Sequence, residues 1–179
     1  MKTKTVLCAL ALIAVFTACG GYDKETDFEV SPAEDGKSVV ITDYDGEKLN
    51  VKIPPRIQKM PVTGIGDYAF RGEKIISVAI PKGVTSIDYG AFYNCTSIAS
   101  ITIPSSVTSI GRSAFLNCIG VTSITIPKGV TEIGEDAFSS WEAKQTINVQ
   151  GYANQAAADA AWGKDWRSDC EAVIKYQGK

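Results

Sequence analysis

The sequence repeats one unit of 22 to 23 residues, and this repeat constrains the fold more than any other feature. Four six-residue segments align without gaps and share Ile at the first position, Ala at the fifth and Phe at the sixth: 65–70, 87–92, 110–115 and 133–138. Their phenylalanines are 22, 23 and 23 residues apart. One unit of this length cannot bury its own apolar side, so the repeat predicts a solenoid whose stacked coils bury one another.

The other half of each unit is a short run that ends in proline and alternates polar and apolar residues, as in Ser100-Ile101-Thr102-Ile103-Pro104. This alternation is typical of a strand with one buried face. Two inward columns are expected to stack from coil to coil: Val51, Val78, Ile101, Ile124 and Ile147, and beside them Ile53, Ile80, Ile103, Ile126 and Val149. The phenylalanine of each unit begins a turn or a single helical turn and is expected to fill the core.

The outward residues of the same strands are small and polar, and they form the candidate binding face: Asn50, Lys52, Ser77, Ser100, Thr102, Ser123, Thr125, Thr146 and Asn148. A flat polar face of this kind can dock a partner or can be plain solvated sheet, and the sequence leaves both readings open. It carries no aromatic cluster of the kind that stacks on sugar rings.

The unit Ile-Gly-x-x-Ala-Phe-x-x-Cys, followed by Ile-x-Ile-Pro-x-x-Val-Thr, resembles the BspA-like class of leucine-rich repeats over roughly residues 39–150. The resemblance implies a right-handed leucine-rich-repeat solenoid, mainly β with short helical turns, of about five coils capped at both ends. It also implies a bacterial cell-surface or secreted protein that binds other molecules, usually proteins or host matrix, without performing chemistry.

The first 18 residues have a basic start at Lys2 and Lys4, an apolar run from Val6 to Phe16, and small residues before Cys19. This pattern is typical of a secretory signal and is too short for a spanning helix. The residues Phe16-Thr17-Ala18-Cys19 resemble a bacterial lipobox, which predicts lipidation of Cys19 and anchoring to a membrane. The alternative is an ordinary signal peptide. We expect residues 1–18 to be a lipoprotein signal peptide and 19–37 a lipidated tether.

The repeats are expected at 65–150, between an N-terminal cap with the first coil at 38–64 and a C-terminal cap at 151–179. Asp45-Gly46 lies between two β-rich runs and is a turn signal. The alanine-rich segment 153–162 predicts a short helix that Gly163 ends. Three tryptophans near this end are either a hydrophobic lid on the last coil or a sugar-binding set: Trp141, Trp162 and Trp166.

Cys95 and Cys118 occupy the same position in consecutive units. Stacked coils place them at about the 4.7–4.9 Å spacing of neighbouring strands, so they form either a disulfide or a ladder of buried thiols. Neither these two nor Cys170 has the spacing of a zinc site.

Composition argues against several classes of function. The chain contains no histidine, which removes the commonest general base and transition-metal ligand. Its formal charge of −2 leaves no basic stripe for nucleic acid. No nucleophile or nucleotide-binding motif is present, and we expect no cofactor, metal or catalytic site. The acidic residues after the isoleucine of each unit are expected to form a charged edge: Asp67, Asp88, Glu135 and Asp136.

These observations predict a non-enzymatic lipoprotein of the cell envelope, anchored to the outer membrane and exposed at the surface, with a protein-binding or adhesion role. Its expected partners are host or bacterial surface proteins or matrix, with glycans as a further class, and not nucleic acid. The alternative is an envelope lipoprotein that captures polysaccharide, which solvent-exposed tryptophans would favour. An enzyme would need a pocket lined by paired carboxylates, which the sequence does not indicate.

Overall fold

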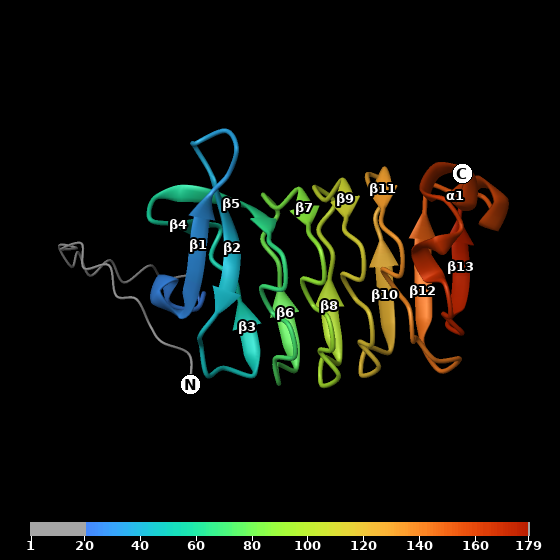
Figure 1. The fold of residues 1–179 in the computed structure, drawn as a ribbon, viewed down its shortest axis with the longest axis horizontal. Helices are drawn as coiled ribbons and strands as arrows, with labels where there is room; N and C mark the ends of the chain where they lie inside the picture. The colour runs from blue at the N-terminus through green and yellow to red at the C-terminus, as the bar shows by residue number, and fades with distance from the viewer. Residues whose placement is uncertain (1–20, 179) are drawn as a thin grey trace.

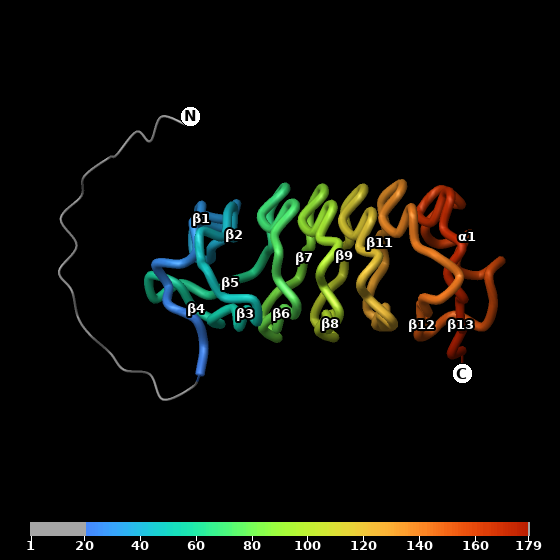
Figure 2. Tube along the Cα trace, turned by 90° about the horizontal axis from the view of Figure 1, so that it is seen from below, coloured from blue at the N-terminus to red at the C-terminus, as the bar shows by residue number. Residues whose placement is uncertain are grey.

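The structure is a computed structural model that describes residues 21–178. Over this range the chain winds into a β-solenoid of about six turns whose coils stand side by side in one row (Figures 1 and 2). The expected fold class, a capped leucine-rich-repeat solenoid that is mainly β, is confirmed. The strands are β1 (Phe28–Pro32), β2 (Val39–Tyr44), β3 (Asn50–Lys52), β4 (Arg56–Ile57), β5 (Met60–Ile65), β6 (Ser77–Ala79), β7 (Ser86–Ile87), β8 (Ser100–Thr102), β9 (Ser109–Ile110), β10 (Ser123–Ile126), β11 (Glu132–Ile133), β12 (Thr146–Gln150) and β13 (Val173–Gln177).

The coils contribute strands to two rows that run along the solenoid. One row is a sheet in the order β1-β2-β5-β7-β9-β11, with β4 paired to β5. The other consists of β3-β6-β8 and β10-β12-β13, and β8 lies beside β10. Equivalent repeat positions pair in register, as Ser77 does with Ser100 and Ile87 with Ile110. Because register follows the repeat, each position of the unit forms a column along the molecule.

The inward columns make one continuous core. Both predicted columns of aliphatic residues are buried, as are the four phenylalanines of the repeat. The rings of Phe70, Phe92, Phe115 and Phe138 stack with centroids 5.2, 5.5 and 5.4 Å apart. The N-terminal cap extends this stack through Tyr44, whose ring centroid lies 5.4 Å from that of Phe70. The phenylalanine column is therefore core, as predicted.

The segments that contain the phenylalanines are turns. The position two residues after each phenylalanine adopts a positive φ, at Gly72 (71°), Asn94 (65°), Asn117 (59°) and Ser140 (63°). Glycine and asparagine tolerate this left-handed conformation best, which explains three of the four residue types. The side chain of Asn117 also donates a hydrogen bond to the side-chain oxygen of Asn94 in the preceding coil.

The N-terminal cap includes more of the chain than its predicted range 38–64. Strand β1 lies in the segment expected to be tether, and it pairs antiparallel with β2 after a 3-10 turn, η1 (Glu25–Asp27). The β-rich runs on either side of Asp45-Gly46 form β2 and β3, but these strands belong to different sheets. The turn therefore carries the chain from one sheet to the other. Strand β1 pairs with the outer backbone groups of β2 and becomes the edge strand of the longer sheet.

The C-terminal cap covers the end of one row of strands with a helix and extends the other row with a strand. The helix α1 (Gln155–Trp162) begins after Asn154, whose side chain accepts a hydrogen bond from the Ala157 amide, and it ends at Gly163 as predicted. It packs beside β11, while β13 pairs in parallel with β12. A second 3-10 turn, η2 (Asp165–Arg167), takes the place of a following coil, because its carbonyls accept the amides of Asp136 and Phe138. The strand β13 accounts for a further partial coil beyond the five expected.

Candidate functional site

The structure brings all nine residues of the candidate binding face together on one side of the solenoid. They lie in two adjacent rows along β3, β6, β8, β10 and β12. Six of the side chains are exposed, and Ser77, Thr146 and Asn148 are half-buried. The inward neighbours on the same strands are buried, so the solvated face consists of these polar side chains and the exposed Ala79 on ordered strands.

Hydrogen bonds between coils order part of this face. The hydroxyl of Ser77 donates to the Asn50 side-chain oxygen at 2.7 Å, and the Asn148 amide donates to the Ser123 hydroxyl at 3.0 Å. A shallow depression of about 400 Å³ lies over β3, β6 and β8, lined by residues that include Lys52, Ser100 and Thr102. Such a surface can make a broad contact with another macromolecule.

Strand β13 extends the face beyond the predicted residues. It places Val173 beside Thr146, and Lys175 beside Asn148, in the same two rows. Both added side chains are exposed, and 47% of the Val173 surface is accessible. Neither residue was predicted as part of the face. The alternation Val173-Ile174-Lys175 was the available signal for a strand with one outward side, but it lacks the proline that marks the other strands.

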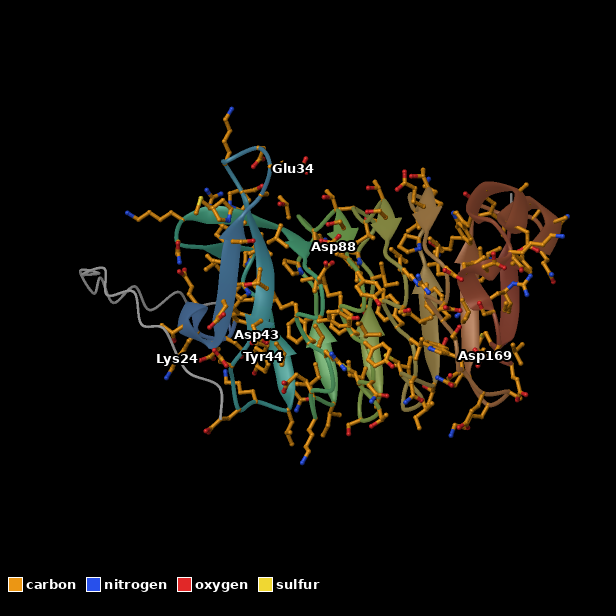
Figure 3. All side chains as sticks on the ribbon, in the orientation of Figure 1. Lys24, Glu34, Asp43, Tyr44, Asp88 and Asp169 are labelled. Atoms are coloured by element: carbon orange, nitrogen blue, oxygen red, sulfur yellow. The ribbon has the colours of Figure 1, made fainter. Side chains whose placement is uncertain are left out.

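A ladder of threonines runs along the other sheet. The hydroxyl of each threonine donates to the backbone carbonyl of the threonine one coil before it, at 3.1 Å for Thr85, 3.2 Å for Thr108 and 3.3 Å for Thr131. The loop between β1 and β2 borders an open depression of about 510 Å³ that is also lined by Thr63 and Thr85. Figure 3 labels Glu34 on the loop and Asp88 on the coils beyond it. Burial raises the pKa of the Asp88 carboxyl.

The acidic residues after the repeat isoleucines lie along one edge of the solenoid. Asp67 accepts a hydrogen bond from the Tyr89 amide at 3.1 Å. Arg112 interrupts the row, and its guanidinium lies 3.4 Å from the Glu135 carboxylate and 4.0 Å from that of Asp136. Among residues 21–178, no group of three or more Cys, Asp or Glu side chains is arranged to hold a metal ion.

Cys95 and Cys118 are free and buried, so the ladder of thiols is confirmed and the disulfide is not formed. Each donates to the carbonyl of the phenylalanine one coil before it, Cys95 to Phe70 at 2.8 Å and Cys118 to Phe92 at 3.1 Å. Trp141 occupies the same column, and its indole N–H donates to the Phe115 carbonyl at 2.9 Å. Burial raises the pKa of Cys95 to about 12, so this thiol is protonated and unreactive at neutral pH.

The three tryptophans seal the last coil, and the sugar-binding interpretation of them is wrong. Trp141, Trp162 and Trp166 expose 1%, 8% and 0% of their surface. Trp166 packs edge-on against Phe138 with ring centroids 5.8 Å apart, because the end of the phenylalanine stack has to be covered. The observation that would have favoured a polysaccharide-capturing lipoprotein is therefore not met.

The predicted lipidation site, Cys19, lies outside the residues that the structure describes. Within residues 21–178 the longest helix is α1, and no helix has the length and apolar character needed to cross a membrane.

The geometry above agrees with a comparison against known families. Residues 53–160 match the BspA type leucine rich repeat region in six copies. The chain belongs to the BspA-type leucine-rich repeat family. This BspA-type scaffold and its fold are typically non-enzymatic, and leucine-rich repeat domains generally mediate protein interactions. A comparison with curated proteins found no match.

Solved structures of bacterial leucine-rich repeat proteins resemble this BspA-type chain. The leucine rich repeat protein of T. pallidum is 25% identical over 86% of the chain with a TM-score of 0.68, and the chain spans 64% of that protein. A leucine rich cell surface protein of Faecalibacterium prausnitzii is 26% identical over 88% of the chain with a TM-score of 0.57, and the chain spans 55% of it. A leucine-rich repeat protein of Bacteroides capillosus, 22% identical with a TM-score of 0.60, shows the shared fold.

Proposed function

We propose that this chain is a non-enzymatic lipoprotein displayed on the bacterial cell surface, where it binds a protein partner through the candidate binding face. The observation that carries the proposal is the alignment of nine polar side chains, eight of them short, in two rows along five neighbouring strands. The name of the similar Faecalibacterium cell surface protein supports the location.

The physical basis of the proposal is a rigid surface with many short side chains. Serine, threonine and asparagine lose little rotamer freedom on binding, and the strands beneath them are already ordered. The face is continuous from β3 to β13 and carries a lysine at each end, Lys52 and Lys175. It therefore suits a broad adhesive contact with a surface protein or matrix component better than capture of a small molecule.

The N-terminal cap holds the chain in place soon after the proposed lipidation site, Cys19. The buried Asp23 carboxylate accepts the Lys48 ammonium at 2.6 Å and the Lys52 amide at 2.8 Å. The four residue-to-residue steps from Cys19 to Asp23 can span at most about 14 Å. Lipid on Cys19 would hold the N-terminal cap close to the outer membrane, with the rest of the solenoid projecting from it.

The test uses full-length protein in detergent micelles and a panel of immobilised matrix proteins, namely collagen, laminin and fibronectin. We expect the double variant Ser100→Arg with Ser123→Arg to weaken binding at least about tenfold, because two long charged side chains prevent close contact. Thr108→Arg on the other sheet is the matched control and should bind as the wild type does. Equal binding by the wild type, the double variant and Thr108→Arg would show that the binding site lies off this face. If the wild type binds none of the matrix proteins, the matrix-binding role is contradicted.

A further inference from the structure

Four side chains at the turns of the first two repeats gather into a cluster on the surface. The rings of Tyr68 and Tyr89 pack edge-on with centroids 4.8 Å apart, and those of Tyr68 and Tyr93 are 6.3 Å apart. The guanidinium carbon of Arg71 lies 5.0 Å from the centroid of Tyr68 and 5.5 Å from that of Tyr93. Tyr89 is 40% exposed and Arg71 is exposed, so this tyrosine–arginine cluster is open to solvent.

The solenoid does not require these residues at these positions. In the next two repeats the positions of Tyr89, Tyr68 and Tyr93 are held by other residue types: Arg112, Ser113 and Leu116, and then Glu135, Asp136 and Ser139. The turn itself is unchanged, because the residue before the alanine keeps a φ near 55° to 58° in all four repeats. The cluster is therefore an addition to the scaffold.

Gly90 shapes the cluster. The ring of Tyr68 lies against the backbone of Gly90, and a Cβ at that position would stand 2.6 Å from Cε1 of Tyr68. The equivalent residues in the later repeats, Ser113 and Asp136, have side chains, and the same position one coil before each of them holds no aromatic residue. The absence of a side chain at position 90 thus gives Tyr68 the place from which it contacts Tyr89, Tyr93 and Arg71.

The guanidinium of Arg71 carries a positive charge and N–H donors that are available to a ligand. Within residues 21–178 its guanidinium forms no hydrogen bond and no ion pair, whereas Arg112 on the same edge pairs with Glu135. Two tyrosine rings hold the Arg71 group in place by cation–π contact, which leaves the N–H edge free. A planar guanidinium with a free edge matches a carboxylate in a two-point hydrogen-bonded pair.

We propose that the tyrosine–arginine cluster binds the carboxylate of an Asp or Glu side chain in an extended acidic segment of the protein partner. The proposal rests on the protein-binding function proposed above and names a second contact of that partner. Tyrosine and arginine are the residue types that dominate the energetics of protein interfaces. The Tyr89 amide donates to the Asp67 carboxylate, so one negative group already stands next to the cluster, and the site suits a single negative charge better than a doubly charged phosphate.

The experiment measures fluorescence anisotropy of a labelled synthetic peptide, twelve residues of alternating Glu and Ala, on full-length protein in detergent micelles. We expect saturable binding that weakens as salt rises, and no binding of the same peptide with Gln in place of Glu. Arg71→Gln should lower the affinity at least about tenfold, and Arg71→Lys should lower it less, because lysine keeps the charge but loses the planar pair. Arg112→Gln is the matched control and should leave the affinity unchanged.

Equal affinity of wild type and Arg71→Gln, or no binding of the Glu peptide at millimolar concentration, would overturn the proposal. Stronger competition by sialyllactose than by unlabelled peptide would overturn it in favour of an acidic sugar. Circular dichroism of each variant excludes unfolding as the cause of a loss. The double variant Ser100→Arg with Ser123→Arg should still bind the peptide, so failure of the strand face as a matrix-binding site and failure of this cluster give different results.

Discussion

Two surfaces of this solenoid, the strand face of β3 to β12 and the edge formed by the phenylalanine-containing turns, differ in how much their residue types change from coil to coil. The strand face repeats mostly small polar residues along five strands, and two hydrogen bonds join side chains of neighbouring coils, Ser77 to Asn50 and Asn148 to Ser123. The other surface is the turn edge, formed by the outward residues of the turns that contain the repeat phenylalanines. Its residue types change from coil to coil, from tyrosines and Arg71 to the ion pair of Arg112 with Glu135. The alanine and phenylalanine of each turn carry the packing, so the outward positions beside them are free to vary. This difference fits the two proposals above, a broad contact on the strand face and a specific contact at the turns.

The largest expected effect on stability comes from comparing the buried side and the outward side of a single turn. Phe115 is buried between two stacked rings, and Leu116 beside it is half-buried on the turn edge. We expect Phe115→Ala to lower the free energy of unfolding by about 3–5 kcal/mol, because it leaves a cavity in the stack. Leu116→Ala should cost well under half of that. Urea unfolding followed by circular dichroism measures both, and similar losses would show that the turn edge also carries the fold.

The second effect concerns pH and the buried thiols. Burial raises the pKa of Cys95 to about 12 and raises that of Cys118, from an ordinary value near 9. Below pH 9 folded and unfolded chains both keep these protons. Above it the unfolded chain loses them first, so each thiol lowers the free energy of unfolding by about 1.4 kcal/mol per pH unit until the folded thiol ionises near its raised pKa.

Urea unfolding between pH 7 and 10.5 measures this loss. The matched control is the double variant Cys95→Ala with Cys118→Ala, which keeps the tyrosine and lysine titrations but lacks the buried thiols. The variant should lose less stability than the wild type above pH 9. Parallel pH profiles would contradict the buried, protonated state of the two cysteines.

The third effect tests whether Gly90 shapes the tyrosine–arginine cluster. Gly90 and Gly72 both have positive φ, 56° and 71°, but only Gly90 has an aromatic ring against it. Alanine at either site should cost about 1–2 kcal/mol for the left-handed backbone. We expect Gly90→Ala to lower the free energy of unfolding more than Gly72→Ala does in urea. Gly90→Ala should also weaken binding of the acidic peptide. Equal losses with unchanged peptide binding would show that Tyr68 does not depend on Gly90.

The smallest effect is expected from the ion pair on the turn edge. Arg112 and Glu135 are both more than half exposed, so solvent screens their attraction. Arg112→Ala should change the free energy of unfolding by less than about 1 kcal/mol, and 1 M salt should remove the difference. A larger loss would make this part of the turn edge structural.

The sequence predicted the core columns and the strand face because both follow from the repeat. Equal spacing places Ile101 beside Ile124 without any knowledge of the rest of the chain. Strands β1 and β13 were not predicted as strands, because each is stabilised by a partner, β2 or β12, and carries no repeat signal of its own. The tyrosine–arginine cluster was missed for a related reason. Tyr68 and Tyr89 stand at different repeat positions in adjacent coils, and only the stacking brings their rings together.

The most direct test of the account is labelling of intact cells that express the full chain, beside cells with Cys19→Ala. We expect external antibody and protease to reach the wild-type protein on intact cells, and the variant to be lost from the membrane fraction. Protection of the wild-type protein until the outer membrane is opened would place it in the periplasm and contradict an adhesive role at the surface. Full membrane retention of the variant would contradict the lipid anchor at Cys19.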